Sequence, residues 1–218
     1  MSQAQQFLNA GPVTFLAPSD KAFAANSQAL SKMSHDQILA TLQYHLLAGN
    51  YSTEDPVNGF FHQGSISLAP TVLNNKTYFS LGPDTNRSQV ALLSRNDKGF
   101  PIIVGNKKNV TFSSQNTTVS QGSLSLAVID DFLSIPGTLS NTTADIGLKG
   151  LPQVLKMLQL SDALDNAAGL TVFAPTDAAF KAAESTLKGQ TNTTLLAGVV
   201  LGHAINGTAI YGQDFMAT

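Results

Sequence analysis

Histidines and aspartates that recur at matched positions are the side chains of this sequence best suited to chemistry. The chain has only four histidines, at positions 35, 45, 62 and 203. His45 follows Asp20, and His203 follows Asp177, at nearly the same spacing. A carboxylate can orient an imidazole by accepting a hydrogen bond from one ring nitrogen. The pattern predicts two structural Asp–His hydrogen bonds, each of which ties the start of one helix to the end of the next.

Catalysis has little support in the residue pattern. A serine hydrolase needs serine, histidine and an acid together, and the G-x-S-x-G turn that often presents such a serine does not occur. A glycosidase needs two facing carboxylates, whereas the adjacent acids Glu54-Asp55 and Asp130-Asp131 would point to opposite faces of a strand. There is no cysteine and no metal-binding or phosphate-binding motif. We expect a protein that is not an enzyme and that holds no metal or cofactor.

The composition is that of a folded chain with little charge. Hydrophobic residues make up 43% of the 218 residues, which is enough for a core, whereas charged residues make up only 12% and the net charge is −2. A nucleic-acid-binding surface would need a clear excess of basic residues, so that class is excluded. The longest apolar run, Leu195–Leu201, is far shorter than the roughly 20 residues of a membrane-spanning helix, so no such segment is expected.

Glycosylation signals are the sharpest feature of the polar composition. Eight Asn-x-Ser/Thr sequons occur, about three times the number that the Asn, Ser and Thr contents produce by chance. They predict a secreted glycoprotein, and the alternative is a composition that is simply rich in Asn and Thr. The sequon asparagines are Asn50, Asn75, Asn86, Asn109, Asn116, Asn141, Asn192 and Asn206.

An internal repeat defines the domain organisation. Residues 13–23 read VTFLAPSDKAF and residues 170–180 read LTVFAPTDAAF, with six of the 11 positions identical. We expect a first domain over residues 1–136 that lacks its opening helix. We expect a second over residues 137–218 that has only the N-terminal part and lacks the later strands.

Local patterns predict an α+β fold in which helices precede strands. Short buried strands are expected at Thr14–Leu16 and Thr171–Phe173, each followed by a helix that Ser19 or Asp20, and Thr176 or Asp177, can cap. Apolar spacing predicts further helices over His35–Leu47, with Ile38, Leu39, Leu42 and Leu46 on one face, and over Gly150–Asn166. Later segments read as strands joined by turns, namely Ile66/Leu68, Tyr78–Leu81, Val90–Leu93, a turn at Asn96–Gly99, Ile102–Val104, Val110–Phe112 and Leu124–Ile129.

The ordered motifs resemble those of the fasciclin (FAS1) domain. Thr171–Phe180 closely matches the family's TVFAPTDxAF-like opening, Tyr44–Gly49 matches its Tyr-His segment, and Val128–Asp130 matches its closing strand. The resemblance implies a twisted, wedge-like two-sheet core with packed helices. It also implies secreted or surface-anchored proteins that act in adhesion and in matrix or cell-wall organisation, with a fungal style of composition. Two positions depart from the family pattern, Ala127 for a common His and Gly202 for the Tyr of Tyr-His.

Two segments are candidate binding surfaces. In some animal relatives the Tyr-His segment is implicated in integrin binding, which here would involve Tyr44, His45, Leu46 and Leu47, although these aliphatic residues also fit a core. The loop Gly49–Gly64 carries Tyr51, Phe60, Phe61 and His62, whose rings could stack on wall polysaccharide. The expected partners are therefore cell-surface or matrix proteins, with a cell-wall carbohydrate-binding module as the alternative and a hydrolase as a remote one.

The ends of the sequence bear on localisation. Residues 1–12 carry no basic start and no apolar stretch of a signal peptide, and Asp214–Thr218 is not an apolar tail. Together with the sequons, these ends predict a fragment of an extracellular or cell-surface protein whose signal peptide and any anchor lie outside the fragment.

Overall fold

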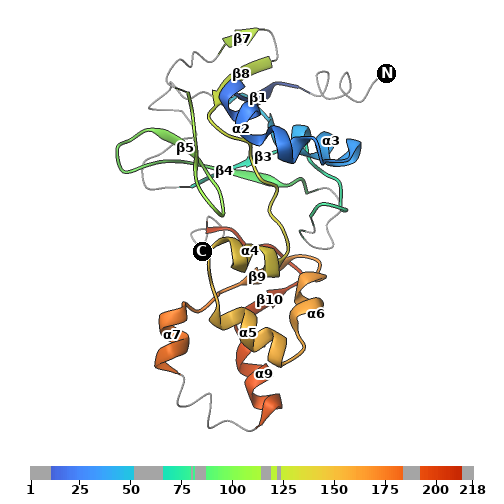
Figure 1. Ribbon diagram of the computed structural model, residues 1–218, viewed down its shortest axis with the longest axis vertical. Helices are drawn as coiled ribbons and strands as arrows, with labels where there is room; N and C mark the ends of the chain where they lie inside the picture. The colour runs from blue at the N-terminus through green and yellow to red at the C-terminus, as the bar shows by residue number, and fades with distance from the viewer. Residues whose placement is uncertain are drawn as a thin grey trace. The chain divides into compact units, whose positions relative to one another are not determined.

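The chain divides into two compact units. The computed structural model describes residues 11–51, 66–79, 81, 87–113, 119–121, 124–183 and 192–212, with the backbone alone at 119–121. Unit 1 consists of Met1–Tyr78 and Asn86–Ile135, and unit 2 of Phe79–Thr85 and Pro136–Thr218. Both units combine helices with β-sheet, so the predicted α+β class is confirmed (Figure 1).

The first sheet of unit 1 is built around its earliest strand. The order is β2 (Leu46–Ala48), β1 (Val13–Pro18), β8 (Leu124–Ile129) and β7 (Val119–Gln121). Strand β1 runs antiparallel to β2 and parallel to β8. Strand β8 alternates as predicted, but its buried residues are Ser125, Ala127 and Ile129, whereas the larger residues between them are only half-buried.

The second sheet of unit 1 is an antiparallel meander of β3 (Ser67–Pro70), β4 (Val90–Arg95), β5 (Pro101–Val104) and β6 (Val110–Thr111). The predicted turn at Asn96–Gly99 joins β4 to β5, and Gly99 adopts a φ of 80° there. The Asn96 side chain accepts hydrogen bonds from the Lys98 and Phe100 backbones at 3.0 Å, which fixes the turn. The predicted strand at Tyr78–Leu81 is wrong at Tyr78, which lies in a turn closed by a hydrogen bond to Asn75.

Two helices connect β1 to β2. Helix α2 (Asp20–Leu30) begins at an N-cap formed by Ser19, and α3 (His35–Tyr44) begins at a capping box formed by Ser34 and Gln37. The predicted continuation of α3 to Leu47 is wrong, because Leu46 and Leu47 enter β2 and pair with Phe15 and Thr14.

The predicted apolar face of α3 is also only partly buried. Ile38 and Leu42 stay 40% and 44% exposed, while the core takes Ala40 and Tyr44 from this helix. The largest fully buried apolar side chains of unit 1 are Leu16, Leu47, Leu73, Leu93 and Ile129.

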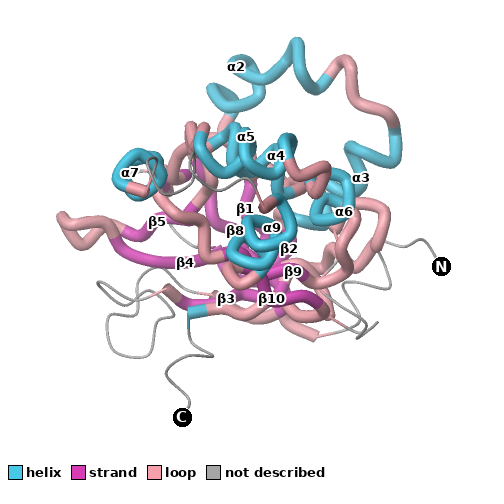
Figure 2. The backbone as a smooth tube through the Cα atoms, turned by 90° about the horizontal axis from the view of Figure 1, so that it is seen from below, coloured by secondary structure: helices cyan, strands magenta, loops and turns pink. Residues whose placement is uncertain are grey.

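Unit 2 consists of short helices around a two-stranded sheet (Figure 2). Strands β9 (Leu170–Val172) and β10 (Ala204–Asn206) pair antiparallel. The helices are α4 (Leu139–Asp145), α5 (Gly150–Met157), α6 (Ser161–Asp165), α7 (Asp177–Ala182) and α9 (Thr193–Leu201). The single helix predicted over Gly150–Asn166 is in fact α5 and α6, because Gln159 between them adopts a left-handed φ of 57° that interrupts the helix.

Candidate functional site

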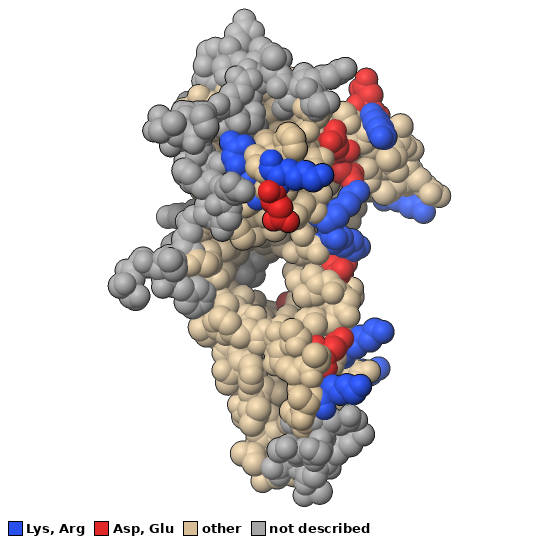
Figure 3. Space-filling model, turned by 90° about the vertical axis from the view of Figure 1, so that its left-hand side faces the viewer, with Lys and Arg blue, Asp and Glu red and all other residues tan. Residues whose placement is uncertain are grey.

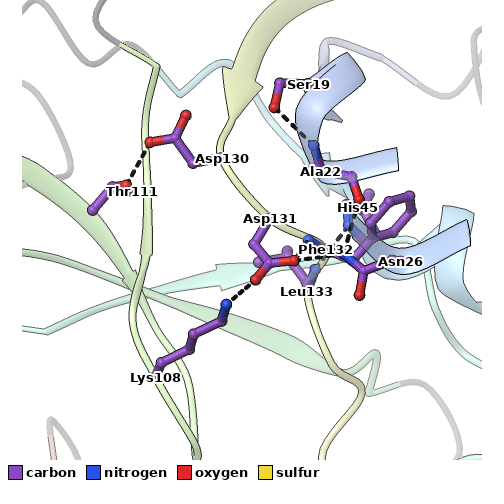
Figure 4. Close-up of polar contacts among 10 residues, drawn as sticks. All are labelled: Ser19, Ala22, Asn26, His45, Lys108, Thr111, Asp130, Asp131, Phe132 and Leu133. Carbon is purple, nitrogen blue, oxygen red and sulfur yellow. Dashed lines mark hydrogen bonds and ion pairs between the residues drawn. The ribbon is translucent and has the colours of Figure 1, made fainter. Parts of the chain in front are cut away.

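The imidazole of His45 is a buried polar side chain of unit 1 with a hydrogen-bond partner at each ring nitrogen (Figure 4). It lies at the C-cap of α3 and is 1% exposed. Its Nε2 atom accepts a hydrogen bond from the Leu133 backbone N–H at 3.0 Å. The other ring nitrogen, Nδ1, lies 2.7 Å from the Thr41 carbonyl oxygen. Because a backbone N–H can only donate, Nε2 is the unprotonated nitrogen and Nδ1–H is the donor to Thr41.

Burial makes the neutral form of this ring strongly preferred. Desolvation lowers the pKa of His45 to about 4, although the hydrogen bond to the Thr41 carbonyl acts in the opposite direction. The Phe132 ring packs edge-on, with ring centroids 5.5 Å apart, and itself packs edge-on against Phe23. His45 is therefore uncharged at neutral pH and joins the end of α3 to the segment that follows β8.

The predicted Asp20–His45 hydrogen bond is wrong. Both ring nitrogens already have backbone partners, and Nε2 needs a donor, which an ionised carboxylate cannot provide. Asp20 is exposed at the first position of α2, whose N-terminus is capped by Ser19 Oγ accepting from the Ala22 N–H at 3.3 Å. The sequence identified the structural histidine correctly but not its partners, which are main-chain atoms and leave no residue-type signal.

In the second repeat, a histidine again lies at the end of a helix, but the aspartate has other partners than the sequence predicted. His203 Nδ1 lies 2.9 Å from the Val199 carbonyl oxygen, as His45 Nδ1 lies beside Thr41. Asp177 accepts hydrogen bonds from the N–H groups of Lys149 and Gly150 at the start of α5. These two N–H groups lower the pKa of Asp177, Gly150 most strongly. The predicted Asp177–His203 pairing is thus replaced by a link between Asp177 and α5.

The other residues of the Tyr-His segment are mostly core residues. Tyr44 is 7% exposed and its hydroxyl donates to the Val90 carbonyl oxygen at 3.3 Å. Leu47 is fully buried, and Leu46 is half-buried on β2. The structure therefore brings the four predicted binding residues together, but only Leu46 among them offers a substantial surface.

A carboxylate cluster beside His45 was not predicted from the sequence. Asp131 Oδ1 accepts hydrogen bonds from the Asn26 side chain at 2.9 Å and from the Phe132 N–H at 2.8 Å, and its other oxygen pairs with Lys108 (Figure 4). Burial alone would raise the pKa of Asp131, but these three donors together lower it. The neighbouring Asp130 accepts from the Thr111 hydroxyl at 2.7 Å. Both carboxylates are engaged in holding the end of β8.

A second missed feature is a threonine that both repeats share. Thr14 Oγ1 donates to the Gly49 carbonyl oxygen and accepts from the Tyr51 N–H, each at 2.8 Å. Thr171 bridges the Thr208 carbonyl and the Ile210 N–H in the same way, at 3.0 Å and 2.8 Å. Both repeated motifs have a threonine at this position, and this match is the sequence signal from which the feature could have been predicted.

The predicted aromatic loop is described only at its start. Tyr51 is 7% exposed, and burial raises its pKa. Phe60, Phe61 and His62 lie outside the described residues. The part of the loop that the structure describes therefore presents no aromatic surface for a sugar.

Six of the eight sequon asparagines are described, and all six lie at exposed positions. They are Asn50, Asn75, Asn109, Asn141, Asn192 and Asn206, while Asn86 and Asn116 lie outside the described residues. Within the described ranges, no group of three or more His, Asp or Glu residues could hold a metal ion, and no helix is long and apolar enough to cross a membrane.

The repeated strand–helix motif, the histidine at the end of a helix in each repeat and the closing strand of the first repeat define an α+β protein of two tandem repeats. The polar residues that the repeats share support the fold. The sequence profile of the fasciclin domain matches residues 1–121 and 147–217. The chain therefore belongs to the fasciclin domain family. Domains of this family occur in extracellular and cell-adhesion proteins and are generally non-enzymatic.

Comparison with solved structures identifies a FAS1 domain pair from the insect cell adhesion molecule fasciclin I as similar. The identity is 19%, the TM-score is 0.44, and the match covers 97% of this chain and 70% of the other. The comparison with curated protein sequences found no match.

Proposed function

We propose that this protein is a non-enzymatic adhesion or matrix-organising module, N-glycosylated, that acts outside the cell or at its surface. The observation that carries the proposal is the exposure of every described sequon asparagine. A glycan can be attached only to an asparagine at the protein surface. Buried asparagines among the sequons would therefore have argued against glycosylation. Within this proposal, residues 1–136 and 137–218 are two tandem domains.

Local hydrogen bonds leave the glycan-carrying atom available at several sequons. Asn75 Oδ1 accepts from the backbone N–H of Thr77, the threonine of its own sequon, at 2.9 Å. Asn192 Oδ1 accepts from two N–H groups at the start of α9. Asn50 Oδ1 accepts from the Ser125 hydroxyl at 2.8 Å. In each case the carbonyl oxygen makes the bond, and the amide nitrogen is the atom to which a glycan is attached.

The surface is suited to weak, repeated contacts. Charges of both signs are interspersed, and most of the described surface in the view of Figure 3 is uncharged. Contacts of this kind are individually weak, and tandem modules convert them into strong attachment because each bound module raises the effective concentration of the next.

The Tyr44–Leu47 segment has an indirect role in this proposal. Three of its four side chains are buried, and Leu46 is only half-buried, so the segment offers little surface for direct contact with a partner. His45 and Tyr44 instead hold the end of α3 against the rest of unit 1. We propose that changes in this segment reduce adhesion in proportion to the loss of folded protein.

The test is aggregation of beads coated with the glycosylated protein, expressed in a eukaryotic secretory host. Beads carrying the wild-type protein should cluster, and beads carrying the Leu46→Ser variant, matched for folded protein by circular dichroism, should cluster comparably. Loss of clustering in a fully folded Leu46→Ser variant would assign adhesion to the Tyr-His segment directly. Absence of clustering at any coating density, on beads and on matrix-coated surfaces, would contradict the adhesive role.

One observation favours a polysaccharide partner as the second candidate. Phe100 follows the rigid turn between β4 and β5 and is 62% exposed. An exposed aromatic ring on a fixed turn can stack on a sugar ring. Co-sedimentation with insoluble cell-wall polysaccharide tests this candidate, because the wild-type protein would sediment and the Phe100→Ala variant would remain in solution.

A further inference from the structure

One asparagine of unit 2 is followed directly by a glycine. The sequence contains two Asn-Gly pairs, at 58–59 and 206–207, and the second lies within the described residues. In an Asn-Gly pair the backbone nitrogen of the glycine can attack the side-chain amide of the asparagine, because glycine has no Cβ to obstruct the approach. Asn206 and Gly207 are both exposed, so water and base reach the pair.

The fold requires the glycine of this pair. Gly207 follows β10 with a φ of 91°, and Gly49 follows the equivalent strand β2 of unit 1 with a φ of 142°. Residues with a side chain rarely adopt such angles. The residue before the glycine is Ala48 in unit 1 and Asn206 in unit 2, and both are exposed. The two repeats therefore share one exposed turn, and the second repeat carries a side-chain amide there.

Strand pairing holds the Asn206–Gly207 pair in a geometry that prevents the attack. Asn206 lies opposite Leu170 of β9, and the Gly207 N–H donates to the Gly169 carbonyl oxygen at 2.7 Å. For the attack, the Gly207 nitrogen must lose this proton and the chain must rotate about the Cα–C bond of Asn206. Neither change is compatible with a paired, extended strand whose next N–H is hydrogen-bonded.

A side-chain bridge holds the chain just beyond the pair. Thr171 Oγ1 donates to the Thr208 carbonyl oxygen at 3.0 Å and accepts from the Ile210 N–H at 2.8 Å. Thr208 is the residue next to Gly207, so the Asn-Gly pair lies between the paired part of β10 and this bridge. Because both restraints come from β9, the attack requires β10 to separate from β9 first.

We propose that Asn206 is a site of spontaneous deamidation that is controlled by the pairing of β9 and β10. When the strands separate, the deprotonated Gly207 nitrogen bonds to Asn206 Cγ, and Nδ2 leaves as ammonia with the proton that Gly207 gave up, so that a cyclic succinimide forms. Water then opens the ring at one of its two carbonyl carbons, which gives aspartate or isoaspartate. Each product carries one additional negative charge. Isoaspartate also adds a methylene group to the main chain, so Gly207 can no longer lie opposite Gly169 in the original register.

A glycan on Asn206 blocks this reaction. The nitrogen that leaves as ammonia, Asn206 Nδ2, is the atom to which an N-linked glycan is attached. Glycosylation and deamidation therefore exclude each other at Asn206. The mutual exclusion rests on the proposed N-glycosylation, whereas the control by strand pairing does not.

The test follows Asn206 in the full chain, produced in a host without N-glycosylation and incubated at mildly alkaline pH. Trypsin releases residues 189–218, which contain Asn192 and Asn206, and electron-transfer fragmentation distinguishes asparagine, aspartate and isoaspartate at each position. Deamidation of Asn206 should be at least about tenfold slower in the folded chain than in urea, because strand pairing protects it. Asn192 is followed by Thr193, whose side chain obstructs the attack, so it should remain asparagine in both samples.

Two threonine substitutions provide a matched control. Thr171→Val removes the bridge beyond Gly207, so it should speed deamidation of Asn206 in the folded chain at least about threefold. Amide exchange of the Gly207 N–H should rise by the same factor, because both reactions need the same opening. Thr14→Val removes the equivalent bridge of unit 1 and should leave both rates at Asn206 and Gly207 unchanged.

Protein from a eukaryotic secretory host separates the two parts of the proposal. Chains with a glycan on Asn206 should form no aspartate or isoaspartate there while the glycan is attached, and deamidation beneath an intact glycan would contradict the mutual exclusion. Chains of the same sample without a glycan should deamidate at the rate of the unglycosylated protein. Complete absence of the glycan would therefore count against glycosylation of this sequon, while the same deamidation rate would still support control by strand pairing.

Three results would overturn the proposal. Equal rates in the folded chain and in urea would mean that strand pairing does not control the reaction. Equal acceleration by Thr14→Val and Thr171→Val would mean that the opening is not that of β9 and β10. Intact asparagine at position 206 after incubation in urea would mean that the pair is unreactive.

Discussion

Acidification should destabilise unit 1 through His45. The ring has a pKa of about 4 in the folded protein and 6.5 as its ordinary value. Between these two pH values the unfolded chain takes up a proton that the folded chain does not, so the stability is fully present above pH 6.5 and falls as the pH falls toward 4. The difference between the two pKa values corresponds to a loss of about 3 kcal/mol.

The surroundings of His45 explain why its protonation is unfavourable in the folded protein. Protonation of Nε2 would place an N–H opposite the Leu133 N–H at 3.0 Å, so a buried hydrogen bond would become a contact between two donors. The ring is also 1% exposed, so water cannot solvate the charge. Both effects act on the folded state alone.

A His45→Gln variant isolates this contribution. The glutamine amide oxygen can accept from Leu133 but takes up no proton, so the variant should be less stable at pH 7 by about 1–2 kcal/mol and should lose much less stability on acidification. Urea unfolding of the wild type and the variant, followed by circular dichroism at pH 7, 6, 5 and 4.5, gives the two pH profiles. Parallel profiles, or an NMR titration that places His45 near its ordinary pKa, would refute the reasoning.

Four further substitutions have defined outcomes. Asp131→Ala should lower the stability of unit 1 by about 1–2 kcal/mol, because Asn26 and Phe132 lose their hydrogen-bond acceptor. Lys108→Ala should lower it by less than about 1 kcal/mol in the same urea assay, because the Lys108 side chain is 69% exposed. Gly150→Ala should destabilise unit 2 by about 1–3 kcal/mol, since its Cβ would lie 2.5 Å from the Phe180 ring; unchanged thermal unfolding would contradict that packing. Asp177→Asn should speed amide exchange at Gly150, and unchanged exchange would disprove the link to α5.

Local sequence signals predicted the fold where the structure depends on neighbouring residues. Ser19 and Thr176 cap their helices as expected, and the turn at Asn96–Gly99 and strand β8 lie where the pattern placed them. Each of these features is determined by residues within a few positions of one another, which is why composition and periodicity suffice to find them.

The features that were not predicted from the sequence depend mainly on contacts between residues far apart in the chain. Leu46 and Leu47 fit the helical pattern of α3, but β1 draws them into a strand, and no local signal distinguishes the two outcomes. The partner of His45 is likewise a main-chain N–H 88 residues away. The break at Gln159 depends on one backbone angle at a residue type that does not favour it.

The extracellular assignment is tested most directly by glycopeptide mapping of the full-length protein from its native host, with and without enzymatic removal of N-linked glycans. The proposed function predicts occupied sites among the exposed asparagines, with Asn75 and Asn192 on ordered turns as the clearest cases. Each occupied asparagine should be converted to aspartate when the glycan is removed. Unmodified asparagine at every sequon would contradict passage through the secretory pathway and with it the proposed role in adhesion.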